Sequence, residues 1–164
     1  MNEHLNHSPS NHQNSINAMA VSATLHCLTG CAIGEVLGLI IGTAFGLSNV
    51  VTTLIAIALA FVFGFGLSTL PLIKAGLGFT AALSIVIAAD TLSITTMEIV
   101  DNAVMYTIPG AMHATIIDPL FWISMVIALT VAFFAALPVN KYLLKKNKGH
   151  ALTMNALGGH DHHH

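Results

Sequence analysis

The sequence contains very little charge. Only 7% of its 164 residues are charged, arginine is absent, and all five basic residues are lysines. Ordinary soluble domains carry about 25% charged residues. A protein that binds nucleic acid also needs a cluster of basic side chains to neutralise phosphates. These shortages exclude a soluble enzyme domain, a nucleic-acid-binding protein and a polar disordered chain.

Long apolar runs take the place of the missing charge. Hydrophobic residues make up 55% of the chain, and four stretches are long enough to cross a hydrocarbon core about 30 Å thick as helices. These stretches cover about 25–47, 50–73, 76–106 and 119–144. Short connections place consecutive helices side by side and antiparallel. The sequence therefore predicts an all-α integral membrane domain over residues 23–146, an up-down antiparallel bundle of four transmembrane helices.

The positions of the lysines predict the orientation. Lys74 follows the second stretch and the other four lysines follow residue 140, so an even number of helices separates the two groups. Both groups then lie on one side, which the positive-inside rule makes the cytoplasm. Residues 1–22 and 147–164 are expected to be flexible tails on that side. The first segment lacks the charged and apolar regions of a cleaved signal peptide.

Glycine recurs at every fourth position of the first stretch, which gives that helix one smooth face. The members of this stripe are Gly30, Gly34, Gly38, Gly42 and Gly46. Small residues at this spacing let two helix backbones approach closely in lipid. We expect the stripe to pack helices together. Packing against a second copy of the chain would produce a homo-oligomer, whereas packing against the second or fourth helix of the same chain would not.

Beside the glycine stripe, Cys27, Cys31 and Glu35 form a second set at spacing four, and His26 precedes them. Two ligands at i and i+4 on a helix can point at one metal ion, and thiolates select Cu(I) or Zn(II). Buried cysteines are also common simply as small packing residues. The carboxyl of Glu35 strengthens the functional interpretation, because a carboxyl inside a membrane helix is costly. We therefore interpret these four residues as a candidate metal entry site.

The third stretch carries the remaining membrane acids, Asp90, Glu98 and Asp101, together with Met97 and Met105. No lysine or arginine lies in the middle of a span to pair with these acids, so they must be protonated, bonded to hydroxyls or paired with a cation. Neutral, satisfied carboxyls are one outcome and an ion pathway is the other. Glu98 and Asp101 are also compatible with a place at the outer interface.

The acids of the two helices are expected at different depths. At about 1.5 Å per residue, Asp90 lies roughly 24 Å from Lys74. By the same count, Glu35 lies about 12 Å inside the membrane from the same side. We expect Glu35 and Asp90 to be offset along the membrane normal, with water carrying a proton or cation between them.

Further candidate ligands lie outside the spans. The outer connection contains Met112, His113 and Asp118, which could receive or release an ion. The tails contain eight histidines that could collect metal, as histidine-rich tracts do: His4, His7, His12, His150, His160, His162, His163 and His164.

Several strings of the sequence are distinctive together, among them Thr24-Leu-His-Cys-Leu-Thr-Gly-Cys-Ala-Ile-Gly-Glu35 and Met97-Glu-Ile-Val-Asp-Asn-Ala-Val-Met105. Further strings lie at 88–90, 108–112, 118–122, 138–140 and 148–150. With them the chain resembles a bacterial integral membrane family, domain of unknown function 4396. The resemblance covers about Thr24 to His150. It implies this helix arrangement, a multi-pass protein of the bacterial inner membrane, and no particular activity.

The residues predict a small transporter or membrane-bound handler of a transition metal, copper first and zinc second. In this hypothesis Cu(I) or Zn(II) is the bound or transported ion, and no organic cofactor is expected. The expected partners are the lipid bilayer, the metal ion or a proton, and a second copy of the chain, in a homo-oligomer formed through the glycine stripe. One alternative is a proton or monovalent-cation channel or coupling subunit that uses Glu35 and Asp90. Another is a structural accessory subunit of a larger membrane complex. No phosphate-binding loop or nucleophile–base arrangement indicates an enzyme.

Overall fold

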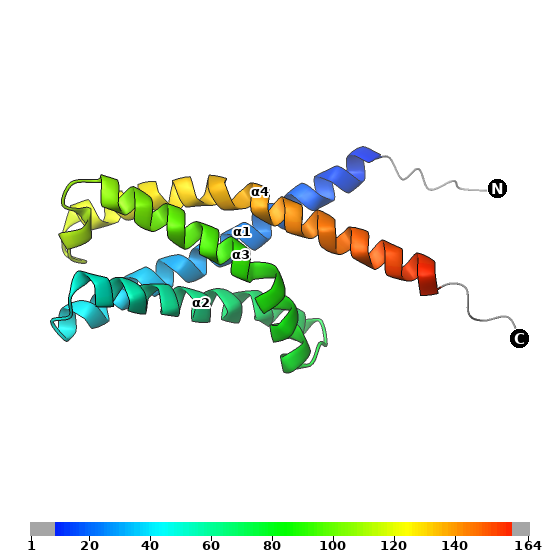
Figure 1. Ribbon diagram of the computed structural model, residues 1–164, viewed down its shortest axis with the longest axis horizontal. Coiled ribbons are helices and arrows are strands. Elements are labelled where there is room, and N and C mark those ends of the chain that lie inside the picture. The colour runs from blue at the N-terminus through cyan, green and yellow to red at the C-terminus, as the bar shows by residue number, and fades with distance from the viewer. Residues whose placement is uncertain (1–8, 159–164) are drawn as a thin grey trace, which may run out of the picture.

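The computed structural model describes residues 9–158, which form four long helices and one short 3₁₀ helix. Helix α1 covers Pro9–Ala44, α2 Asn49–Lys74, α3 Phe79–Thr107 and α4 Pro119–Gly158, and η1, the 3₁₀ helix, covers Ala111–His113. The α1–α2 and α3–α4 connections lie at one end of the bundle, and the α2–α3 connection lies at the other (Figure 1). The predicted antiparallel up-down bundle is confirmed.

All four helices are long and apolar enough to cross a membrane. The candidate spans are Ile16–Ala44, Asn49–Lys74, Phe79–Thr107 and Pro119–Lys146. Large hydrophobic side chains point outward on these helices, as lipid-facing side chains do; Leu54, Val62, Ile99 and Phe134 are each more than half exposed. The protein is a multi-pass integral membrane protein. Both α1 and α4 extend beyond the expected spans, into segments that the sequence analysis assigned to the tails.

Two helices end in a tight turn that contains a left-handed glycine. At the end of α1, Gly46 has φ +61° and the Leu47 amide donates to the Gly42 carbonyl over 2.9 Å. At the end of α2, Gly76 has φ +95° and the Leu77 amide donates to the Leu72 carbonyl. This is the Schellman arrangement, which satisfies carbonyls at a helix end and reverses the chain within a few residues.

The glycine stripe of α1 packs against α2 of the same chain. A methyl group added at Gly30 would lie 2.5 Å from the Cα atom of Gly64, and one at Gly38 would lie 2.5 Å from the Cβ atom of Ala56. Gly34 and Gly42 are equally close to Ala60 and Thr52. The exception is Gly46, which lies in the turn with nothing near it. A homo-oligomer formed through this face is therefore a wrong expectation, because α2 already fills it.

A buried hydrogen bond joins α1 to α4. The amide nitrogen of Asn140 donates to the Thr24 hydroxyl oxygen over 2.8 Å, and that hydroxyl donates to the Ala20 carbonyl over 2.7 Å. Asn140 and Thr24 are 3% and 0% exposed. Since an unpaired amide would be costly at this depth, the bond helps to fix the position of α1 between α2 and α4.

We expect Gly34→Ala to destabilise the protein by about 1–3 kcal/mol, the usual cost of overpacking. The new methyl group would overlap the backbone of Ala60, which cannot move without shifting α2. Thermal unfolding in detergent, followed by circular dichroism, measures the change. The matched control is Gly66→Ala, because a methyl group there meets nothing within 4 Å. An equal unfolding temperature for both variants would contradict the proposed close packing.

Candidate functional site

One face of α1, next to the glycine stripe, carries Cys27, Cys31 and Glu35 toward the interior of the bundle. Both cysteines are fully buried, at 0% and 1% exposure, and both are free thiols. The three residues follow each other at spacing four, so they share one side of the helix. The glycine contacts with α2 turn this side toward α3.

Three carboxyl groups of α3 face the three α1 residues. The thiol of Cys27 interacts with Asp90, the thiol of Cys31 with Glu98, and the carboxyl of Glu35 with Asp101. Because α1 and α3 run in the same direction, these pairs follow one another in order along the bundle. We call the six residues the acid–thiol array.

Two serine hydroxyl groups lie beside the array at its Asp90 end. The side chains of Ser68 on α2 and Ser93 on α3 lie next to Cys27, and Ser68 also lies next to Asp90. His26 is exposed and close enough to act on Asp90 electrostatically. This end of the array therefore approaches the surface of α1.

At the other end of the array, the carboxyl groups lack hydrogen-bond donors. Asp101 is only 2% exposed and neither of its oxygens has a donor, and Oε2 of Glu35 is also without one. No lysine or arginine belongs to the array. Two facing carboxyl groups in such a place satisfy each other when one of them carries a proton, because the protonated oxygen donates to the other group. The geometry thus places two carboxyl groups that can share a proton between α1 and α3.

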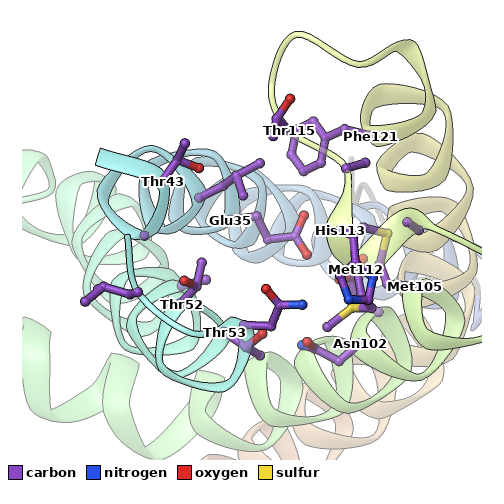
Figure 2. Close-up of a pocket in the computed structure, with 18 of the residues that line it drawn as sticks. Glu35, Thr43, Thr52, Thr53, Asn102, Met105, Met112, His113, Thr115 and Phe121 are labelled. Carbon is purple, nitrogen blue, oxygen red and sulfur yellow. The ribbon is translucent and has the colours of Figure 1, made fainter. Parts of the chain in front are cut away.

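The Glu35 end of the array opens into a cavity of about 240 Å³, which we call the vestibule. Figure 2 shows the Glu35 carboxyl pointing into it. Its lining includes Glu98 and Asp101, hydroxyl groups, and parts of the connection between α3 and α4; the residues labelled in Figure 2 are Glu35, Thr43, Thr52, Thr53, Asn102, Met105, Met112, His113, Thr115 and Phe121. A cavity of this size with polar walls has room for several water molecules.

The predicted metal entry site is not assembled as expected. His26 directly precedes Cys27, so it points about 100° away around the helix, and its Nδ1 lies 2.7 Å from the Ser22 carbonyl oxygen. Among the residues whose side chains the structure describes, no three His, Cys, Asp or Glu side chains are grouped as a metal site would require. Cys27 and Cys31 do share one buried cluster with Met97.

The predicted depths of Asp90 and Glu35 are in the wrong order. The first span begins at Ile16, well before Cys27, so Glu35 lies about 28 Å along it, whereas Asp90 lies about 16 Å along α3. Glu98 and Asp101 are buried, at 5% and 2% exposure, so they do not sit at an exposed interface.

The remaining predicted residues fall into three groups. Met105, Met112 and His113 line the vestibule, but Asp118 does not. His12 and His150 lie on α1 and α4, with side chains that the structure does not describe. His4, His7, His160, His162, His163 and His164 lie outside the described residues.

Ser93 is one of the hydroxyls expected near the acids of the third stretch, whereas two other polar residues of the site, Ser68 and Asn102, were not predicted. Serines in apolar helices are common, so no signal separated Ser68 from ordinary packing residues. Asn102 directly follows Asp101 and lines the vestibule. An amide next to a carboxyl within a membrane span could have been used to predict that Asn102 belongs to the site.

The fold and the buried array together define a four-helix multi-pass membrane protein with ionisable groups inside its bundle. Residues 17–149 match the family described as domain of unknown function (DUF4396), so the chain belongs to that family. No curated protein and no solved structure matches the chain.

Outside the spans, hydrogen bonds to the Asp118 carboxyl predict that the stability of the fold depends on pH. The Thr115 amide and hydroxyl each donate to Asp118 Oδ2 over 2.8 Å, and they hold the pKa of this carboxyl below its usual range. A lowered pKa stabilises the folded state above the unfolded value of about 3.9, and the contribution is lost as the pH falls through the folded value.

Asp118→Asn should therefore lower the unfolding temperature slightly at neutral pH, and the difference from the wild type should shrink below about pH 4. Thermal unfolding in detergent at several pH values measures it. Thr115→Val removes one of the two donors and should cost less. A difference that stays constant over the whole pH range would show that the charge of Asp118 has no such role.

Proposed function

We propose that the protein conducts protons across the membrane between α1 and α3, alone or as the coupling subunit of a larger complex. The observation that carries this proposal is the register of the two helices, which places a carboxyl of α3 beside each of Cys27, Cys31 and Glu35. Every member of the array can hold or pass a proton. Ionisable groups inside membrane spans typically mark such relays.

The spacing of the array suits a relay. Neighbouring members on α1 are about 6 Å apart along the helix axis, and each has a member of α3 at its side. A proton would move from vestibule water to the Glu35–Asp101 pair, then to Glu98 and Cys31, and then to Cys27 and Asp90. Ser68 and Ser93 supply hydroxyls that can accept one proton while they donate another.

Both ends of the proposed path reach the surface of the bundle. The vestibule opens at the end that holds the α1–α2 and α3–α4 connections. Asp90 is partly exposed near His26 at the other end. The lysines lie at the Asp90 end, which favours a cytoplasmic location for that end and for both termini. In a bacterial inner membrane the vestibule would then face outward.

Removing one carboxyl of the array tests the proposal. We expect Asp101→Asn to lower proton flux by about tenfold or more, because the amide cannot exchange a proton. The full chain is reconstituted in liposomes that contain a pH-sensitive dye, and a potassium diffusion potential drives the flux. Glu98→Gln should act in the same direction.

The matched control is Asp118→Asn, the same chemical change at an exposed carboxyl outside the vestibule. It should conduct like the wild type. Circular dichroism and gel filtration establish that each variant is folded. Wild-type flux no greater than that of empty liposomes, or full flux through folded Asp101→Asn, would refute proton conduction along this path.

A second candidate function, transport of a soft metal ion, is favoured by one observation. Cys27, Cys31 and Met97 are all at most 1% exposed and belong to one buried cluster. Two thiolates and a thioether are ligands that suit Cu(I), with Zn(II) as the weaker match. In this function the metal is the cargo, and the carboxyls of the array would carry the counter-moving protons.

Cys27→Ser/Cys31→Ser distinguishes the two functions. Serine keeps a hydroxyl for proton transfer but is a poor ligand for Cu(I), so copper binding and copper flux should be lost while proton flux persists. Mass spectrometry measures the copper content of the purified protein, and dye-loaded liposomes measure the proton and copper fluxes. Met97→Leu should also weaken copper binding, whereas Met125→Leu, at a buried methionine of a different cluster, should not. Equal copper content in all variants would refute the sulfur site.

A further inference from the structure

We call the side chains of Glu35, Asp101 and Asn102, which line the vestibule, its floor. The floor contains more carboxyl oxygens without a hydrogen-bond donor than one proton can satisfy. Asp101 is 98% buried, lines the cavity and has two oxygens without a donor. Glu35 adds one more such oxygen beside it. Unpartnered buried carboxylate oxygens that face a water-sized cavity provide ligands for a bound cation.

Asn102 adds a second kind of oxygen, that of an amide. Its side-chain nitrogen donates to the Glu98 carbonyl over 2.9 Å, which leaves the amide oxygen as the free end of the side chain. Asn102 lines the vestibule together with Glu35 (Figure 2). Carboxylate, amide and water oxygens are the ligands that hard cations prefer, and none of the floor groups is a soft ligand.

We propose that the vestibule floor binds a monovalent alkali cation, with Na⁺ as the reference ion, in place of the proton held between Glu35 and Asp101. This inference rests on the proposed proton occupancy of the same pair. When the cation enters, the proton leaves to vestibule water, both carboxyl groups become carboxylates, and the net charge of the site is unchanged. An exchange that conserves charge avoids the cost of changing the charge of a buried site.

The size and composition of the site favour a monovalent ion. Divalent Ca²⁺ takes six to eight oxygen ligands, usually with several carboxylates placed around it. The Glu35–Asp101 pair and Asn102 offer two carboxylates and one amide oxygen, and a third carboxyl, that of Glu98, lines the same cavity. The cavity of about 240 Å³ leaves room for waters to complete the shell of an ion that is held less tightly. The other titratable groups that face this place are Glu98 from α3 and His113 from η1; the lining residues from α2 and α4 are not titratable.

Proton release caused by Na⁺ tests the inference on the full wild-type chain. Purified protein in detergent, weakly buffered with a pH dye, receives NaCl or, as the control, choline chloride at equal ionic strength. We expect about one proton per chain to be released by Na⁺ and none by choline, with a matching loss of the infrared band of protonated carboxyl groups. Release by both salts, or by neither, would overturn the inference.

Asn102→Ala removes the amide oxygen and keeps both carboxyls, so the Na⁺ concentration for half-maximal release should rise about tenfold. Asp118→Asn, outside the cavity, should respond like the wild type. An unchanged half-maximal concentration in Asn102→Ala would overturn the assignment of Asn102 as a ligand.

The two proposals fail separately. Flux that depends on Asp101, combined with no effect of Na⁺, would refute the cation site and leave proton conduction standing. Release of protons by Na⁺ without any flux in liposomes would refute conduction and support the site.

Discussion

Helix α1 lies so close to α2 that a methyl group at Gly30 or Gly38 would overlap its neighbour. The contact does more than hold two helices together. A helix has one orientation about its own axis, so placing the glycine face against α2 decides where every other face points. The adjacent face, with its two thiols and one carboxyl, is thereby turned toward α3. The acid–thiol array depends on this contact.

Much of this arrangement is readable from the sequence. Four apolar stretches joined by short links predict the bundle, and the spacing of four residues predicts both faces of α1. The rotation of His26 away from Cys27 also follows from helix geometry, since adjacent residues are about 100° apart. The candidate metal site grouped Cys27, Cys31 and Glu35 by their helical spacing, but it added His26 only because it precedes Cys27 in the sequence, without regard to that rotation.

The sequence alone could not predict which residues of α1 lie beside which residues of α3. The expected depth of Glu35 assumes a span that begins at Cys27, whereas the span begins at Ile16. Residues 16–26 mix apolar and polar side chains, so they do not form an uninterrupted apolar run that would predict a membrane segment. That offset of about three turns assigned Asp90 to the wrong depth relative to Glu35. Pairing between helices distant in the chain depends on such offsets, and no periodicity within one helix reveals them. For the same reason, the sequence could not show that Asn102 faces the vestibule.

The buried acids also explain one another. A single ionised carboxyl in a membrane span is costly, yet Asp90, Glu98, Asp101 and Glu35 occur without a lysine or arginine among them. A carboxyl or thiol lies beside each of these acids, so a shared proton can neutralise them, as lysine and arginine side chains neutralise buried acids in soluble proteins. A proton held in this way is bound to no single residue, because the next member of the array can accept it. The same geometry that makes the acids tolerable in lipid would also let their protons pass from one member to the next, as the proposed conduction requires. At the vestibule, the proposed charge-conserving exchange with a small cation would release such a proton to water.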